Sequence, residues 1–433
     1  MNNIRFPLVV FRLFAVCSGL CVCFTTLLSG CGPAYDIITT PPADDGVSLP
    51  IKSDLFLGVE VKINGKPADV LLDTGTVLFS LIPPSAVEEF GLVPAGANPY
   101  AGEQLGGVGV CGAVGANASL SDQIYVAERL DVGGVIIENA AFVVLEEEGF
   151  NTFESIRVSA ILNGSLLAQV DWRIDQYGKQ LSLFPLNTLA KPDAPAELRL
   201  IGPEPPFFLQ LQGAPKIGGI STFLKYADSK ADAVETLMDT GGGIELAVGE
   251  NLFDTTGWNL SDLPNVEAGL FAAGGTCLTT RFRAPQVDVG SQTYKSVHSI
   301  LLPDSEIGLI GWRFFANHET VSVSPHGGWI EFRKGGQTDG NFAAQLKSFG
   351  IELSLNPDGS YRVKKVTEGS DAQTDGVLIG DIVRAVNGVA TDTLEGKSLL
   401  FGPGPMRDGV AVFTLESADG ELRDFELTAT PIL

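Results

Sequence analysis

The chain has 433 residues, with 28 Lys and Arg against 52 Asp and Glu, a net charge of −24 and 45% hydrophobic residues. This hydrophobic content excludes a largely disordered acidic chain, because such chains lack the apolar surface that a core requires. The negative charge argues against a nucleic-acid partner, whose phosphates require clustered Lys and Arg. The length indicates about two to four folding units. The 51 Gly and the many short apolar runs favour β structure.

Residues 1–30 are almost wholly apolar, carry Arg5 and Arg12, and contain no acidic residue. A run of about 20 apolar residues is long enough for an anchor helix, and a secretory signal cleaved nearby is a second alternative. The segment ends in Leu-Ser-Gly-Cys at 28–31, which resembles the bacterial lipobox. The resemblance implies a signal peptide over residues 1–30 and lipidation of Cys31. We therefore expect export and lipid anchoring in a bacterial cell envelope.

Loss of this signal changes the charge and the cysteine count. Without its two basic residues, 26 Lys and Arg remain against 52 Asp and Glu, so the mature net charge is −26. Three of the six cysteines leave with the signal and Cys31 takes the lipid, so only Cys111 and Cys277 remain. Residues 31–50 are rich in Pro, Asp and Gly, which predicts a flexible tether.

The middle of the chain contains an internal repeat. Leu-Leu-Asp-Thr-Gly at 71–75 matches Leu-Met-Asp-Thr-Gly at 237–241, an offset of 166 residues that also separates the two remaining cysteines. Further along, the offset falls to 148, so the first copy is longer by 18 residues. Alternating apolar and polar residues before an Asn-Gly turn at 64–65 predict strands. We therefore predict two similar β lobes, over residues 51–187 and 198–335.

Local patterns within each copy predict further features. Short helices are expected at 84–90 and 250–254. The acidic stretch at 146–148 is the expected place of the extra residues. The Gly-rich segments 102–115 and 269–275 follow the two Asp-Thr-Gly turns at a distance that suits mobile flaps over a cleft.

The two Asp-Thr-Gly turns, each after an apolar pair, and Gly-Leu-Ile-Gly at 308–311 resemble the aspartic protease superfamily, in pepsin-like or single-chain retropepsin-like form. The resemblance covers both lobes. It implies a mainly β, bilobal fold with a pseudo-twofold axis between duplicated lobes. It assigns catalysis to Asp73 and Asp239, and support of this pair to Thr74, Gly75, Thr76, Thr240 and Gly241.

These residue types suit peptide hydrolysis. Two carboxylates about 3 Å apart do not both ionise readily, so they share one proton. The ionised group can accept a proton from the attacking water, and the protonated group can donate to the developing oxyanion. Gly75 and Gly241 let the two turns approach closely. The resemblance also implies that the hydroxyls of Thr74 and Thr240 bind across to the opposite lobe.

The two copies differ beside the carboxyl pair. Thr76 can offer a hydroxyl to Asp73, whereas Gly242 offers none to Asp239, so we expect Asp73 to be the more readily ionised partner. Lobe one also departs from the family pattern at Asn163, where Gly is usual. Asn tolerates unusual backbone angles better than most residues, and a Gly follows it, which allows the loop to form.

Cys111 and Cys277 occupy equivalent places in the two copies. They form either a disulfide between the lobes or two buried thiols, because a bridge requires Cα atoms within about 7 Å. The sequence leaves both alternatives open.

Residues 340–433 have another pattern. Phe-Gly-Ile at 349–351, Glu-Gly-Ser-Asp-Ala at 368–372 and Gly-Asp-Ile-Val at 380–383 resemble the motif series of PDZ domains. The resemblance implies a small α/β domain with a helix over 393–400 beside a groove, in which a peptide C-terminus adds as a strand. The matching peptide-binding residues are Phe349, Gly350 and Ile351. The alternative is a domain that only packs against the lobes.

These observations predict a membrane-anchored aspartic endopeptidase that hydrolyses peptide bonds with water activated by the Asp pair, and whose PDZ domain recruits or positions substrate. The expected partners are peptides or proteins and a lipid membrane, and the chain is expected to be a monomer. No cofactor and no metal are expected, because His298, His318 and His326 show no ligand spacing. The alternative is a catalytically inactive envelope lipoprotein that uses the cleft and the groove for docking peptides.

Overall fold

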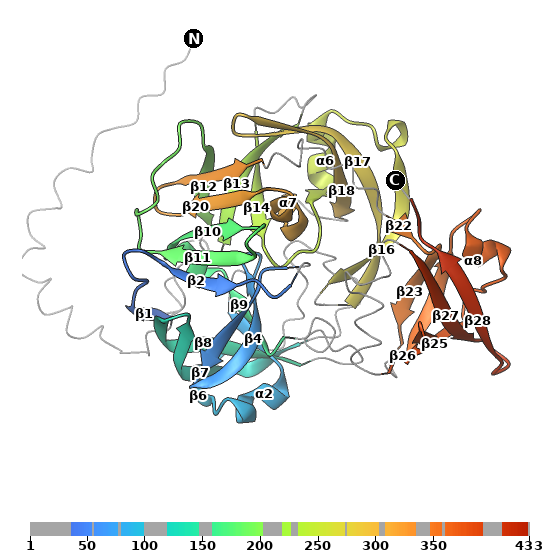
Figure 1. Cartoon of the computed structure of the whole chain (residues 1–433), viewed down its shortest axis with the longest axis horizontal. Coiled ribbons are helices and arrows are strands. Elements are labelled where there is room, and N and C mark those ends of the chain that lie inside the picture. Colours follow the sequence, from blue (N-terminus) through green and yellow to red (C-terminus); the bar gives the residue numbers. More distant parts are fainter. Residues whose placement is uncertain are drawn as a thin grey trace, which may run out of the picture.

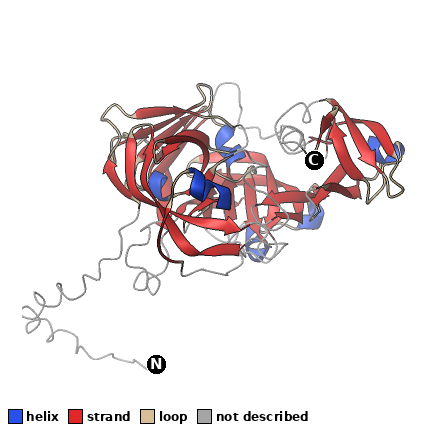
Figure 2. Cartoon of the chain, turned by 90° about the horizontal axis from the view of Figure 1, so that it is seen from below, coloured by secondary structure: helices blue, strands red, loops and turns tan. Residues whose placement is uncertain are grey.

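Strands dominate the computed structural model of the chain, and its helices are short (Figure 2). This agrees with the expected mainly β fold. The structure describes residues 36–53, 56–76, 79–98, 119–146, 158–201, 219–226, 233–272, 275–302, 308–334, 347–356, 360–392 and 409–431.

Lobe one is a closed barrel. Its strands pair in the order β3-β4-β9-β5-β8-β7, and β7 closes the ring by pairing with β3, while β1 and β6 extend the sheet. The β3–β4 hairpin turns at Asn64 and Gly65, whose φ angles of 48° and 81° are those that such a turn requires. The elements of lobe one are β1 (Ile37–Thr40), β3 (Gly58–Ile63), β4 (Lys66–Asp73), β5 (Ser80–Ile82), α2 (Pro84–Glu89), β6 (Val93–Ala97), β7 (Ser119–Val132), β8 (Val135–Glu146), β9 (Ala160–Asn163) and α4 (Ser165–Ala168).

Lobe two repeats this barrel strand for strand. Its closed order is β13-β14-β19-β15-β18-β17, and the parallel pair β14–β19 matches β4–β9 in lobe one. The expected short helices are present as α2 and α6. The elements of lobe two are β13 (Gly219–Tyr226), β14 (Val234–Asp239), β15 (Leu246–Gly249), α6 (Glu250–Thr256), the 3₁₀ helix η1 (Leu260–Asp262), β16 (Asn265–Ala272), β17 (Gly275–Val289), β18 (Gln292–Leu302), β19 (Gly308–Gly311) and α7 (Trp312–Ala316).

A further sheet joins the two lobes (Figure 1). Its order is β12-β21-β20-β10-β11-β2, with three strands from each lobe, so the pseudo-twofold axis passes between β10 and β20. Across this seam Ser324 Oγ donates to Asp171 Oδ1 at 2.8 Å, and both residues are buried. The joining strands are β2 (Val47–Pro50), β10 (Asp171–Asp175), β11 (Gln180–Phe184), β12 (Ala196–Ile201), β20 (Thr320–Ser324) and β21 (Trp329–Arg333).

The predicted flexible tether over residues 31–50 is wrong for residues 37–40 and 47–50, which form strands. β1 pairs with β8, and β2 pairs with β11 as the counterpart of β12, so lobe one begins before residue 51. The reason is local: Val47 and Leu49 turn inward in alternation, and Leu49 is buried against Gly133, where an added Cβ would lie 2.8 Å from Leu49 Cδ2. Residues 31–35 lie outside the described residues.

The extra residues of lobe one are divided between two places. β8 starts at Val135 and its counterpart β18 starts at Gln292, so the two copies are offset by 157 residues at this point. This value is midway between the offset of 166 earlier in the repeat and the offset of 148 later in it. Only half of the insertion therefore falls after β8, next to the acidic stretch at 146–148. The other half precedes β8.

The C-terminal residues form a separate core around Phe349, Tyr361, Val383 and Phe413. Its main sheet has the order β23-β24-β25-β27-β28, with β26 beside β25, and β23 is an edge strand. Its elements are β22 (Lys347–Ser348), β23 (Ile351–Leu355), β24 (Tyr361–Val366), α8 (Asp371–Thr374), β25 (Ile382–Val386), β26 (Val389–Ala390), β27 (Val410–Glu416), β28 (Leu422–Thr428) and β29 (Thr430–Pro431).

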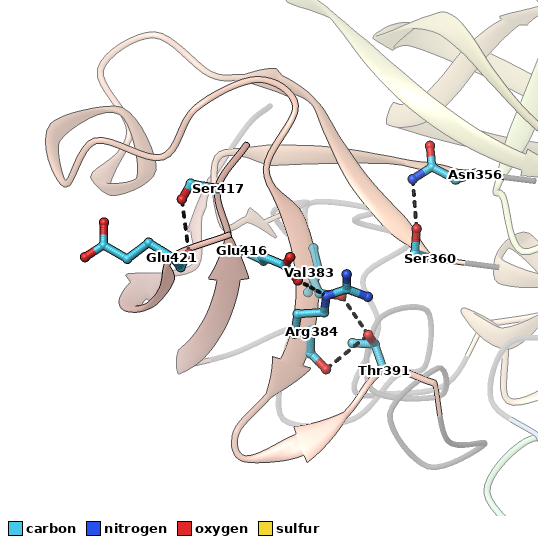
Figure 3. A network of polar contacts seen from close by, with 8 residues as sticks. All are labelled: Asn356, Ser360, Val383, Arg384, Thr391, Glu416, Ser417 and Glu421. Atoms are coloured by element: carbon cyan, nitrogen blue, oxygen red, sulfur yellow. Dashed lines mark hydrogen bonds and ion pairs between the residues drawn. The ribbon is translucent and has the colours of Figure 1, made fainter. Parts of the chain in front are cut away.

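Polar contacts tie the strands of this C-terminal domain together (Figure 3). Arg384 on β25 forms an ion pair with Glu416 on β27. Thr391, which follows β26, donates its hydroxyl to the carbonyl of Val383 at 2.7 Å, so the β25–β26 turn is fixed to its own sheet.

Candidate active site

β4 and β14 deliver the two aspartates to one place. Each strand finishes in three buried residues, 70–72 in β4 and 236–238 in β14, and each ends at the Asp of the Asp-Thr-Gly turn. The parallel neighbours of these strands, β9 and β19, end at the same level. Asp73 is opposite Asn163 on β9, and Asp239 is opposite Gly311 on β19. The duplicated strand order therefore places both carboxyl groups on the pseudo-twofold axis.

The two turns meet in direct contact. A Cβ added to Gly75 would lie 2.8 Å from Asp239 Cγ, and one added to Gly241 would lie 2.6 Å from Asp73 Cγ. Real Cβ atoms do not approach other heavy atoms so closely, so only glycine fits at either position. The carboxyl groups of Asp73 and Asp239 share a hydrogen bond. The structure thus brings together the pair that the sequence predicts.

Thr74 and Thr240 link the lobes beneath this pair. Thr74 Oγ1 accepts from the backbone N–H of Thr240 at 3.1 Å and donates to the carbonyl of Met238 at 2.7 Å. Thr240 Oγ1 accepts from the N–H of Thr74 at 3.1 Å and donates to the carbonyl of Leu72 at 2.6 Å. Both threonines are completely buried, so these contacts fix the spacing of the two turns as the resemblance implied.

The hydrogen bonds to the two carboxyl groups differ. Asp73 accepts from the Gly75 N–H at 2.8 Å and from the Thr76 hydroxyl at 2.6 Å, one bond on each oxygen. Asp239 accepts from the Gly241 and Gly242 N–H groups at 3.0 and 2.7 Å, both on Oδ1. The second oxygen of Asp239 is therefore left for the proton that the pair shares.

Burial, more than any other factor, raises the pKa of Asp239 well above its usual range. The negative charge of Asp73 and the hydrogen bond between the two carboxyl groups raise this pKa further, against the opposing effect of the Gly242 and Gly241 N–H groups. The direction is the one expected from Thr76 and Gly242: the environment favours the protonated form of Asp239.

Asn163 fits its position through hydrogen bonds of its side chain and not through the unusual backbone angle that was expected. It does not adopt a positive φ, and its buried side chain accepts from the Ser165 N–H at 3.2 Å and from the Ser165 hydroxyl at 2.6 Å. In lobe two a Cβ on the equivalent Gly311 would lie 2.3 Å from the Ile244 carbonyl oxygen. Lobe one has room for a side chain here, and lobe two has none.

Sequence reasoning missed the partners that hold Asn163 in place. Ser80 Oγ on β5 accepts from the Asn163 N–H at 3.2 Å, and Ser165 begins α4 directly after it. The spacing of Asn163 and Ser165 is a usable signal, because Asn commonly accepts from the backbone two residues on. The contact with Ser80 has no such local signal.

Several predicted site residues lie outside the described part of the chain: Cys31, Cys111, the flap segment 102–115 and the helix over 393–400. The backbone of Cys277 lies in β17, but its side chain is outside the described residues, so the disulfide stays a prediction. In the second Gly-rich segment, 269–275, the described residues belong to the antiparallel strands β16 and β17, and the role as a flap stays a prediction.

The predicted peptide-binding loop lies directly before β23. Phe349 is buried in the core of the C-terminal domain, with its ring 5.3 Å from that of Phe413. Gly350 has a φ of 76°, and its N–H donates to Ser348 Oγ at 3.1 Å. Ile351 begins the edge strand β23. The free edge suits an added strand, but the Phe349 side chain belongs to the core and the Gly350 N–H already has an acceptor.

Among the described residues, no group of three or more His, Cys, Asp or Glu is arranged to hold a metal ion. No helix in that part of the chain has both the length and the apolar character needed to cross a bilayer.

Two barrels joined by a shared sheet each give one Asp-Thr-Gly turn to a common carboxyl pair. Residues 59–162 match the family model described as aspartyl protease. This match covers most of lobe one with its Asp-Thr-Gly turn and does not extend to lobe two. No curated protein matches the chain.

Solved structures similar to this chain come from two kinds of protease. A retropepsin-like aspartic protease from Rickettsia conorii is 12% identical, with 31% of this chain and 90% of that chain covered and a TM-score of 0.20. The HtrA-type protease AlgW with a decapeptide is 13% identical, with 51% and 76% covered and a TM-score of 0.19. A serine endoprotease from Yersinia pestis is 15% identical, with 66% and 99% covered and a TM-score of 0.18. Scores this low do not define a shared fold.

Proposed function

We propose that the chain is an aspartic endopeptidase, in which Asp73 and Asp239 activate a water molecule for attack on a peptide carbonyl. The observation that carries this proposal is the carboxyl pair itself, held by Gly75 and Gly241 at a contact distance that no other residue type allows. Asp73, as the ionised partner, takes the proton of the water. Asp239, as the protonated partner, donates to the oxyanion that forms on the substrate.

A cleavage assay tests this proposal. The chain from residue 32 onward is incubated with an unstructured protein across acidic to neutral pH, with and without an inhibitor that mimics the tetrahedral transition state. Cleavage that the inhibitor suppresses supports the endopeptidase. Absence of cleavage at every pH, together with retained peptide binding, would favour the alternative, an inactive lipoprotein that docks peptides.

The C-terminal domain is proposed to act as a PDZ domain that recruits or positions substrate. Support comes from β23, which among the described strands lies at the edge of its sheet, a place where an extended peptide can add as a strand. Binding of peptides with a free or an amidated C-terminus, measured by fluorescence anisotropy, tests it. A PDZ-type groove binds the free carboxylate more tightly, and equal affinity would contradict that role.

The proposed site of attachment to the envelope membrane is lipidated Cys31. Cys31 precedes Asp36, the first described residue, by five positions, and five residues extend over at most about 17 Å. The protease body would therefore stay close to the lipid surface and reach substrates near it. Cys31→Ser should abolish incorporation of a labelled fatty acid, and incorporation that persists would exclude this anchor.

A further inference from the structure

A cluster of charged residues connects the C-terminal domain with the candidate active site, and neither the two Asp-Thr-Gly turns nor the predicted peptide groove includes it. β23 of the C-terminal domain packs against β16 and β17 of lobe two (Figure 1). At this contact the carboxylate of Glu352, on β23, lies near the guanidinium of Arg281, on β17. Both side chains are largely buried.

Arg281 is shared between two acidic residues. One is Glu352 of the C-terminal domain, and the other is Glu245, in the segment of lobe two that follows the Asp239 turn. Arg313, on α7, lies 3.9 Å from Glu245 as an ion pair and adds a second positive charge close to Arg281. Two arginines therefore face two glutamates, and one of those glutamates, Glu352, comes from the other domain, where it also pairs with Lys365 at 3.9 Å.

Three members of the cluster, Glu245, Arg281 and Arg313, line a small pocket together with the rest of residues 243–246, the segment that follows the Asp239 turn. The same segment is fixed by the first residues of α7: the Gly311 N–H donates to the Glu245 carbonyl at 3.0 Å, and the Arg313 N–H donates to that of Ile244 at 3.0 Å.

This segment continues without a break to the carboxyl pair. The Trp312 N–H donates to the carbonyl of Gly242 at 2.6 Å, and the Gly242 N–H donates to Asp239 Oδ1 at 2.7 Å. A displacement of residues 242–246 would therefore change the hydrogen bond that orients Asp239.

We propose that Glu352 is a positioning residue for the protease reaction: by docking on Arg281, it makes the C-terminal domain part of the catalytic unit. When the domain is docked, Arg281 is neutralised by both Glu245 and Glu352. When it is undocked, Arg281 and Arg313 compete for Glu245 alone in a poorly solvated pocket, and a buried charge without its partner is unfavourable. Residues 242–246 then relax, and Asp239 loses its alignment.

This inference rests on the proposed endopeptidase function, and a kinetic comparison tests it. Glu352→Gln keeps the shape of the side chain and removes its charge, and Glu368→Gln is the matched control, because Glu368 is exposed on the same domain. Full-length protein in detergent is assayed with a quenched peptide whose C-terminus is amidated, so that carboxylate capture by the groove plays no part. Glu352→Gln should lower kcat about tenfold, within the usual range for coupling between two sites, with KM unchanged.

Glu352→Asp should restore most of kcat, and Glu368→Gln should behave as wild type. An unchanged kcat in Glu352→Gln, or an equal loss in Glu368→Gln, would overturn the inference. A rise of KM alone would also overturn it, because that result assigns Glu352 to substrate binding.

Hydrogen exchange gives a readout that does not require activity. In Glu352→Gln, the amides of Gly311, Trp312 and Arg313 should exchange faster than in wild type, while those of β4 in lobe one stay the same. If wild-type protein cleaves nothing, the proposed function fails but this exchange result still tests the docking. Unchanged exchange at all three amides would reject the docking whether or not the protein is a protease.

Discussion

The two lobes carry the same Asp-Thr-Gly turn on the same strand of the same barrel, yet they treat their aspartates differently. Lobe one gives Asp73 a hydroxyl donor from Thr76, and it accommodates a side chain at Asn163. Lobe two gives Asp239 two backbone donors on one oxygen and leaves no room at Gly311. The duplicated framework thus fixes where the carboxyl groups lie, and the residues beside them give each carboxyl group a different set of hydrogen bonds.

The largest expected difference between the lobes concerns the position opposite each Asp. Gly311→Ala forces a Cβ to within 2.3 Å of the Ile244 carbonyl oxygen, and it should lower the free energy of unfolding by about 3 kcal/mol and abolish cleavage. Asn163→Gly removes the side-chain contacts with Ser165 and should lower the free energy of unfolding by about 1 kcal/mol with activity retained. Urea unfolding and a cleavage assay measure both. Equal effects would contradict the asymmetry.

A second difference is that only lobe two contains histidine, and His318 is buried between Tyr294 and the carbonyl of Phe314. Burial lowers the pKa of His318 from 6.5 to about 4. Below pH 6.5 the imidazole of His318 binds a proton in the unfolded chain but not in the folded chain. The contribution of His318 to the free energy of unfolding is therefore complete above pH 6.5 and falls as the pH drops towards 4. The loss should amount to about 3 kcal/mol.

His318→Gln, compared with the exposed control His326→Gln, measures this contribution. The pH slope of the unfolding free energy between 6.5 and 4 should become shallower in His318→Gln and stay as in wild type in the control. The comparison with wild type cancels other titrating groups, such as Asp36, whose pKa burial raises to about 7. An unchanged slope in His318→Gln would exclude this role.

The two lobes are expected to contribute equally to the hydrogen bonds that Thr74 and Thr240 form beneath the carboxyl pair. Thr74→Val and Thr240→Val each leave backbone groups of the opposite lobe without a partner, and each should lower the free energy of unfolding by about 2 kcal/mol. The double variant should cost less than the sum, because both hydroxyls belong to one network. A strongly one-sided result would contradict the symmetric linkage between the lobes.

The smallest expected effect concerns the hydroxyl that favours the charge on Asp73. Thr76→Val removes one donor, so the acidic limb of the kcat/KM profile should move to higher pH by about one unit, which corresponds to about 1.4 kcal/mol. The folded structure should stay intact, as shown by an unchanged urea midpoint. A profile that does not move would mean that Thr76 does not bias the proton.

Features that repeat along the chain were predictable. The offset between the Asp-Thr-Gly runs anticipates the two similar β lobes. The family resemblance implies the carboxyl pair and the linkage of Thr74 with Thr240. The strand at Val47–Pro50 was missed because four residues beside a Pro- and Asp-rich segment carry a weak alternation signal, and its pairing with β11 is decided over 130 positions away.

Contacts between units were not predictable from local patterns. Asn163 departs from the expected glycine, and the room for its side chain depends on Ser80 and Ser165, of which only Ser165 is near in sequence. The cluster of Arg281 and Glu352 depends on how the C-terminal domain packs on lobe two. Neither residue differs in the sequence from an ordinary exposed charge on a strand.

The measurement that tests the central claim most directly is cleavage by Asp73→Asn, Asp239→Asn and the double variant, with Asp122→Asn as an exposed control. Residues that act as one unit are not additive, so each single change should remove as much activity as both together, a loss of at least about 10³-fold in kcat/KM. The control should keep wild-type activity. Full activity in either single variant would contradict a shared proton between Asp73 and Asp239.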